Sequence, residues 1–179
     1  MRKLNAILTA VILTLFAIHG VLGALNMFDV AVIIAKYISH TMVALIAVHT
    51  VLSVILTVQS VKVWKKTGAP YLRENGVFWS RRISGFTLML LIPFHMLSFG
   101  ETVNGVYSLY FFSGLKLSAS ILFVICLAFH IIANVKPMLI SFGIKKLRPR
   151  AGDILFFLSV LLLIAVAAFI VYFIRWNTL

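Results

Sequence analysis

Five histidines are the residues of this sequence whose type and spacing point to chemistry. They are His19, His40, His49, His95 and His130, and each lies within or at the edge of a long apolar segment. An ionisable side chain inside a membrane is costly and is seldom found there without a partner or a cofactor. One such histidine is usually explained by a hydrogen bond between helices. Four apolar segments that share the feature favour a bound metal, because neutral imidazole is an axial ligand of haem iron.

The elements that must position these histidines are five apolar segments. Of the 179 residues, 63% are apolar and 11% are charged, which excludes a soluble domain. A membrane-spanning helix needs about 20 apolar residues. The sequence therefore predicts an all-α integral membrane protein, with residues 1–179 forming one up-down bundle of five helices. We expect these helices near residues 4–25, 31–61, 83–99, 115–140 and 154–174.

The first segment also has the outline of a signal peptide. Arg2 and Lys3 precede its apolar run, which ends in the small pair Gly23-Ala24. Because the apolar run is long for a signal core, we interpret the segment as a retained helix.

Lysine and arginine residues gather at alternate ends of the predicted helices. Thirteen of the 16 flank the N-terminus, the second link and the fourth link. Basic ends of membrane helices face the cytoplasm, so we expect a cytoplasmic N-terminus and an external C-terminus. The same basic face suits anionic lipid. The 13 residues are Arg2, Lys3, Lys62, Lys65, Lys66, Arg73, Arg81, Arg82, Lys136, Lys145, Lys146, Arg148 and Arg150, whereas Lys36, Lys116 and Arg175 lie on the other side.

The number of histidines allows two haems, each with two imidazole ligands. In an up-down bundle of the first four helices, the first lies diagonally opposite the third and the second opposite the fourth. This arrangement pairs His19 with His95 and His49 with His130. His19 lies about 22 Å along its helix from Leu4, and His95 about 20 Å from Arg82, so the first pair is level.

His40 is an alternative ligand to His49. Nine residues at about 100° each place the two histidines on opposite faces of one helix, so only one can point into the bundle. We prefer His49, because it lies deeper in the apolar run, whereas His40 follows Lys36 at the outer edge.

A porphyrin also needs room and partners for its propionates. Small residues must line such a slot, and Ser84-Gly85 precedes His95 on the third helix. Simple helix packing explains Gly85 equally well. Arg81 and Arg82, with Lys62, are suited to pair with propionates that emerge at the same end.

The chain resembles the dihaem cytochrome b subunit of quinol:fumarate reductases and succinate dehydrogenases of the five-helix type. The resemblance spans nearly the whole chain and is strongest from Phe78 to Gly85, followed by His95. His19, His49 and His130 are similar as well. In that family the first and third histidine-bearing helices hold the haem distal to the catalytic subunits, and the second and fourth hold the proximal haem.

The resemblance implies a membrane anchor that carries two b haems and exchanges electrons with menaquinone or ubiquinone. Flavoprotein and iron–sulfur subunits on the cytoplasmic face would interconvert succinate and fumarate. The membrane would be the cytoplasmic membrane of a bacterium or archaeon, which the chain crosses several times.

A quinone site needs polar groups that handle two protons near a haem. The sequence offers an outer set, which is His40, Asp29, Glu101 and Asn104, and an inner set, which is Trp79, Ser80, Arg82 and Ser84. We favour the outer set, because topology and propionates already explain the inner charges. A histidine there can exchange protons near neutral pH, and a carboxylate can pass them to water.

Two other functions stay open from the sequence. The first is a related b-type cytochrome that passes quinol electrons to a different redox partner outside the cytoplasm. The second is a haem-free membrane transporter or assembly protein. A visible absorption spectrum separates the second from the rest.

Overall fold

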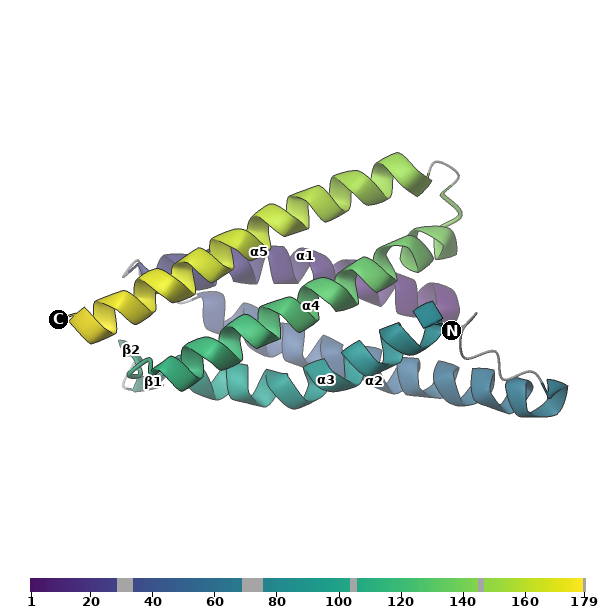
Figure 1. Cartoon of the computed structure of the whole chain (residues 1–179), viewed down its shortest axis with the longest axis horizontal. Coiled ribbons are helices and arrows are strands. Elements are labelled where there is room, and N and C mark those ends of the chain that lie inside the picture. Colours follow the sequence, from purple (N-terminus) through teal and green to yellow (C-terminus); the bar gives the residue numbers. More distant parts are fainter. Residues whose placement is uncertain (29–33, 69–75, 104–105, 145–146, 179) are drawn as a thin grey trace.

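The described residues of the protein form five α-helices and one small β-hairpin (Figure 1). The structure, a computed structural model of the whole chain, describes residues 1–28, 34–68, 76–103, 106–144 and 147–178. Each helix overlaps one of the five predicted segments, so the all-helical membrane class is confirmed. The helices are α1 (Arg2–Met27), α2 (Ile34–Thr67), α3 (Gly76–Ser98), α4 (Gly114–Ser141) and α5 (Leu147–Thr178).

Several helix boundaries differ from the predicted ones. Helices α3 and α5 both begin seven residues earlier than expected, at Gly76 and Leu147. The added turns carry Arg81 and Arg82 in α3, and Arg148 and Arg150 in α5. Arginine is a good helix former although it lies outside the apolar run. Helix α4 continues through Pro137 to Ser141. Helices α2 and α4 are followed by Gly68 and Gly143, whose positive φ angles of 66° and 73° suit a helix C-terminus.

Four of the helices are long and apolar enough to cross a membrane, namely α1, α2, α4 and α5. Helix α3 is not among these four, and it carries Arg81, Arg82 and Pro93. Large apolar side chains cover the outside of the bundle, and Leu115 and Phe156 are 81% and 72% exposed. So many exposed apolar side chains suit contact with lipid. The chain is a multi-pass membrane protein.

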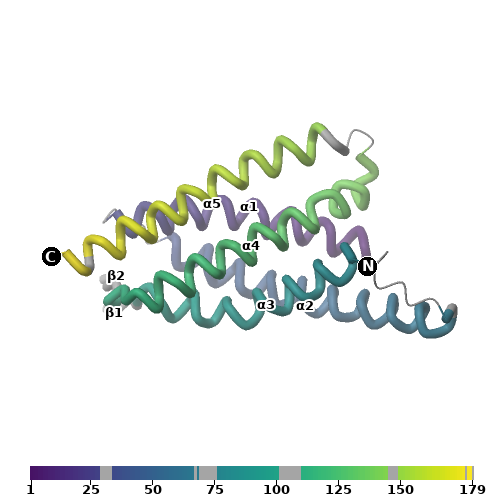
Figure 2. The backbone as a smooth tube through the Cα atoms, in the orientation of Figure 1, coloured from purple at the N-terminus to yellow at the C-terminus, as the bar shows by residue number. Residues whose placement is uncertain are grey.

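Successive helices run in alternate directions, so the two termini lie at opposite ends of the bundle (Figure 1). We call these ends the N-terminal end and the hairpin end. Close packing joins α1 to α2, α3 to α4, and α4 to α5, and α1 also packs against α4 and α5. Helices α2 and α3 are not among the closely packed pairs of the described chain. The last turns of α2 extend past the other helices at the N-terminal end (Figure 2).

The apolar core lies between α1, α4 and α5. Its two clusters of buried side chains include Ala6 of α1, Val135 of α4 and Leu161 of α5 near the N-terminal end, and Phe169 of α5 near the hairpin end. None of the buried members of these clusters comes from the described residues of α2 or α3. The two remaining helices therefore meet the rest of the bundle through other contacts.

A β-hairpin in the link between α3 and α4 was not expected. Strands β1 (Gly100–Val103) and β2 (Val106–Leu109) pair antiparallel, with Val103 opposite Val106. The sequence between the strands is Asn-Gly, which is the pair most typical of two-residue hairpin turns. After β2, Phe112 is fully buried against Phe99, Phe169 and Tyr172.

We expect Phe112→Ala to lower the free energy of unfolding by about 3 kcal/mol, because it removes a fully buried ring and leaves a cavity. Phe156→Ala on α5 is the control, since its ring is 72% exposed, and a loss of about 0.5 kcal/mol or less is expected there. Unfolding in detergent, followed by circular dichroism, measures both. Equal losses would contradict this assignment of the core.

Candidate cofactor site

The rings of His19 and His95 lie next to each other in an edge-on arrangement, on the diagonal helices α1 and α3. Their centroids are 6.1 Å apart and their planes are inclined by 73°. His95 of α3 stacks on Phe123 of α4 at 4.7 Å and meets Phe99 edge-on at 5.0 Å. The ring of His95 is thus held in position by aromatic side chains. Its Nδ1 is buried and has no hydrogen-bond partner among the described residues.

His19 is held instead by a hydroxyl group of the neighbouring helix. Its Nδ1 lies 3.1 Å from Oγ of Ser39 on α2. The same Ser39 hydroxyl lies 2.8 Å from the carbonyl of Ala35, to which it donates. The ring of His19 is only partly exposed.

His49 and His130 lie nearer the N-terminal end, again on diagonal helices, α2 and α4. His130 interacts electrostatically with His49 and with Arg81. Nδ1 of His130 lies 2.9 Å from Oγ of Ser84 on α3, and Nδ1 of His49 lies 3.4 Å from Oγ1 of Thr9 on α1. His19 and His95 are thus in ring contact at one level of the bundle, and His49 and His130, which we call the second pair, lie at the other level without a ring contact among the described ones.

Gly85 lies directly against the second pair. A Cβ atom added at Gly85 would lie 3.2 Å from Cε1 of His130. This distance is shorter than an ordinary van der Waals contact. The glycine therefore allows α3 to approach the ring of His130 while Ser84, the preceding residue, hydrogen-bonds it.

Two arginines of α3 lie beside the second pair, and their hydrogen bonds in the described structure are to uncharged groups. Nε of Arg81 donates to Oδ1 of Asn134 at 2.7 Å, and Asn134 in turn donates to the carbonyl of His130. Nε of Arg82 donates to Thr57 of α2 at 3.2 Å, and its guanidinium lies 3.4 Å above the ring of Phe78. A guanidinium has five N–H donors, so donors remain for an anionic group.

The first pair has the spacing that two ligands of one metal ion need. An imidazole nitrogen binds a first-row metal at about 2 Å, so two rings on opposite sides of one ion have centroids about 6 Å apart. The 6.1 Å between His19 and His95 agrees with this value. The described residues contain no cluster of three or more His, Cys, Asp or Glu side chains. Each pair supplies two imidazoles.

The helices that carry the histidines pack against one another unequally. Close backbone packing joins α1 to α2 and α3 to α4, and α1 touches α4, whereas α2 and α3 are not closely packed. Side chains connect α2 and α3 at the N-terminal end, where Trp64 and Trp79 meet edge-on at 5.9 Å. The donor chemistry of the two histidine pairs, two imidazoles each, is the chemistry that ligation of a b haem uses.

The other predicted site residues make no described hydrogen bond or ring contact with these histidines, or lie outside the described residues. His40 is exposed, and its Nδ1 lies 2.7 Å from the carbonyl of Lys36 in its own helix. Lys62 is exposed on α2. Glu101 belongs to β1, opposite Ser108, and Asp29 and Asn104 are outside the described residues.

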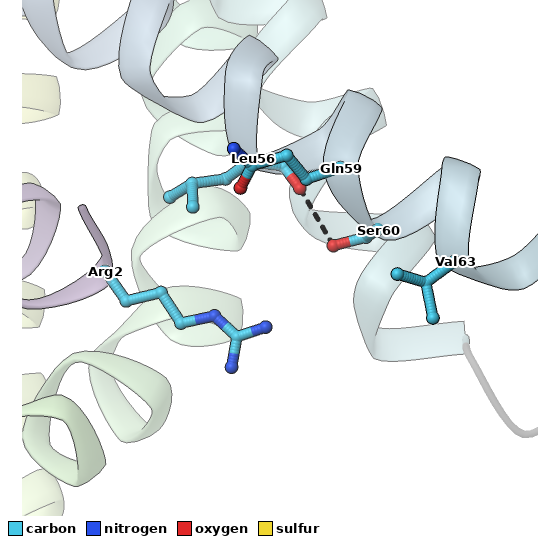
Figure 3. Close-up of a pocket in the computed structure, with 5 residues that line it drawn as sticks. All are labelled: Arg2, Leu56, Gln59, Ser60 and Val63. Atoms are coloured by element: carbon cyan, nitrogen blue, oxygen red, sulfur yellow. Dashed lines mark hydrogen bonds between the residues drawn. The ribbon is translucent and has the colours of Figure 1, made fainter.

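A pocket at the N-terminal end contains none of the histidines. Its volume is about 390 Å³, and it lies between the start of α1 and the later turns of α2 (Figure 3). The hydroxyl of Ser60 donates to Leu56 at 2.8 Å in its wall. The residues that line it are Arg2, Leu56, Gln59, Ser60 and Val63.

Sequence reasoning missed three residues that hold the histidines, namely Thr9, Ser39 and Asn134. Thr9 and Ser39 each lie ten positions before a histidine of their own helix, which is a signal present in the sequence. Asn134 follows His130 by one helical turn, where an amide can reach the histidine carbonyl.

Comparison of the chain with family models, with curated proteins and with solved structures finds no match.

We expect Gly85→Ala to lower the free energy of unfolding by about 1 kcal/mol, although alanine normally stabilises a helix interior relative to glycine. The ring of His130 cannot move away from the new methyl group without lengthening its hydrogen bond to Ser84. Gly23→Ala on α1 is the control, because nothing lies within 4 Å of its added Cβ, and a gain of about 0.5–1 kcal/mol is expected there. Unfolding in detergent compares the two variants. A gain in both would show that His130 is not confined at this contact.

Proposed function

We propose that this chain is the membrane anchor of a succinate dehydrogenase or fumarate reductase type of complex, with two b haems. The observation that supports it most is the diagonal pair of His19 and His95, whose rings have the 6.1 Å spacing of two axial ligands. The diagonal placement of His49 and His130 supports a second site.

Within this proposal, His19 and His95 hold one haem and His49 and His130 hold the other. Bound haem would supply one-electron redox chemistry. Arg81 and Arg82 would bind propionates at the N-terminal end, because their described hydrogen bonds leave guanidinium donors unused. Lys62 on α2 would add a further cation at that end.

The proposed substrate is a membrane quinone, menaquinone or ubiquinone. We place its site at the hairpin end, where α2 begins and where His40 and Glu101 occur. The exposed ring of His40 would exchange protons with the quinol, and the carboxylate of Glu101 would pass them to water. Asp29 and Asn104 complete the proposed set.

The N-terminal end is the proposed cytoplasmic face and the docking face for an iron–sulfur subunit, which carries a flavoprotein subunit. Lys65 and Lys66 lie in the last turn of α2, which extends beyond the other helices (Figure 2). Arg2 reaches towards α2 in the pocket described above, where its guanidinium suits the phosphate of an anionic lipid (Figure 3).

Purified protein is expected to contain two b haems per chain, with the absorption spectrum of bis-imidazole ligation. His19→Ala or His95→Ala should remove one haem, and His49→Ala or His130→Ala the other, because each haem would lose an axial ligand. His40→Ala is the matched control and should keep both. Haem content by the pyridine haemochrome assay measures this. A wild-type value near zero would favour the haem-free transporter or assembly protein.

Charge reversal at the N-terminal end is expected to weaken association with the iron–sulfur subunit. The double variant Lys65→Glu with Lys66→Glu should reduce co-purification with the iron–sulfur subunit at low salt at least tenfold, because complementary charges steer and hold such partners. The same result is expected when the charges of Lys145 and Lys146 are reversed as well. Reversal of Lys36 and Lys116, which belong to the hairpin end, is the control. If only the control variant lost its partner, the redox partner would dock on the opposite face.

A further inference from the structure

A hydroxyl group precedes one histidine in each of the four histidine-bearing helices by nearly the same distance. Thr9 lies ten positions before His19, and Ser39 lies ten before His49. In α4, Ser120 lies ten positions before His130. In α3 the separation is eleven, from Ser84 to His95, and Pro93 lies between them. Ten residues of helix span about 15 Å, so the hydroxyl and the histidine mark two levels.

The antiparallel pair of α1 and α2 uses this spacing reciprocally. His19 of α1 meets the hydroxyl of Ser39 on α2, and His49 of α2 meets the hydroxyl of Thr9 on α1. Each helix therefore supplies a histidine at one level and the hydroxyl that holds its neighbour's histidine at the other level.

The hydroxyls in these contacts fix which ring nitrogen carries the proton. Thr9, Ser39 and Ser84 each donate their one hydroxyl proton to a carbonyl four residues earlier, at 2.7–2.8 Å. Towards the histidine, each oxygen can only accept. Nδ1 of the facing histidine must then be the protonated nitrogen, which leaves the lone pair of Nε2 for a metal ion.

The pair of α3 and α4 shows only half of the same pattern. Ser84 of α3 holds His130 of α4 at 2.9 Å. Eleven residues further along α3 is His95, and ten residues back along α4 is Ser120. The Nδ1 atom of His95 and the Oγ atom of Ser120 are both buried, and neither has a hydrogen-bond partner among the described residues.

Ser120 is well placed to reach His95. Its side chain is 2% exposed. Phe123 follows it by three residues, on the same face of α4, and stacks on the ring of His95 at 4.7 Å. Helices α3 and α4 are closely packed along this interface.

We infer that Ser120 is the positioning residue for His95, the fourth member of a set whose other members are Thr9, Ser39 and Ser84. Rotation of the Ser120 side chain lets its hydroxyl donate to the carbonyl of Lys116 and accept from Nδ1–H of His95. Both buried atoms are then satisfied, and Nε2 of His95 keeps its lone pair for a ligand. This inference rests on the proposed function in that the ligand of His95 is taken to be haem iron.

The test compares Ser120→Ala with Ser118→Ala in the haem-loaded protein. Ser118 is a serine of the same helix, but it is exposed and donates only to the carbonyl of Gly114. A hydrogen bond at Nδ1 makes imidazole a more basic ligand and favours oxidised iron. We expect Ser120→Ala to raise the midpoint potential of the haem at His19 and His95 in an optical redox titration. The second haem, and both haems of Ser118→Ala, should keep their potentials.

Equal potentials in the two variants would overturn the inference while leaving the haem sites intact. If Ser120→Ala loses a haem, the variant Ser120→Thr, which keeps the hydroxyl, is the deciding comparison. Retention of the haem by Ser120→Thr supports the inference, and loss of the haem from Ser120→Thr overturns it. Absence of haem from the wild-type protein would instead contradict the proposed function. The inference is then judged by ¹⁵N shifts of the His95 ring, which should report Nδ1–H in the wild type and lose it in Ser120→Ala; an unchanged ring would overturn it.

Discussion

Buried imidazole rings need hydrogen-bond partners, and this need constrains how the four histidine-bearing helices, α1, α2, α3 and α4, pack together. A polar group left unsatisfied in an apolar membrane interior costs several kcal/mol. A hydrogen bond between membrane helices adds only about 0.6 kcal/mol on average. Avoiding the penalty therefore matters more than gaining the bond, and it sets the register of the helices. Helix α1 must place Thr9 opposite His49 and His19 opposite Ser39 at the same time.

Helix α5, which carries no histidine, has the complementary role. It is strongly apolar, and it packs against α1 and α4 to form the buried clusters. Leu161 of α5 lies 3.4 Å from the place where a side chain of Gly20 would begin, so small residues let the helices approach closely. The bundle thus separates an apolar core from a polar, histidine-bearing region, and α2 and α3 belong mainly to the second.

Apolar length alone was enough to predict five helices, because the membrane requires about 20 apolar residues for each crossing. The first residues of α3 and α5 could not be predicted in this way, since the arginines that precede each apolar run are already helical. The hairpin had a readable signal in Asn104-Gly105, which apolar counting overlooks.

The candidate site was predictable in its histidines but not in their partners. Diagonal placement in an up-down bundle follows from topology, and the structure does bring His19 and His95 together. The hydroxyls of Thr9 and Ser39 could not be assigned, because their contacts depend on the register between two helices. A single sequence does not specify that register, although the ten-residue spacing in each helix limits the number of registers that pair each histidine with a hydroxyl.

The two histidine pairs differ in the charge around them. Arg81 lies beside His49 and His130, and its guanidinium is fixed by Asn134, which is bonded to the carbonyl of His130 itself. Around His95 the close neighbours are the uncharged rings of Phe99 and Phe123. A nearby positive charge disfavours further positive charge at the same place. An apolar shell has a low dielectric constant, which strengthens every electrostatic interaction inside it. The two histidine pairs thus have different electrostatic surroundings, because Arg81 and Arg82 lie at the N-terminal end of α3.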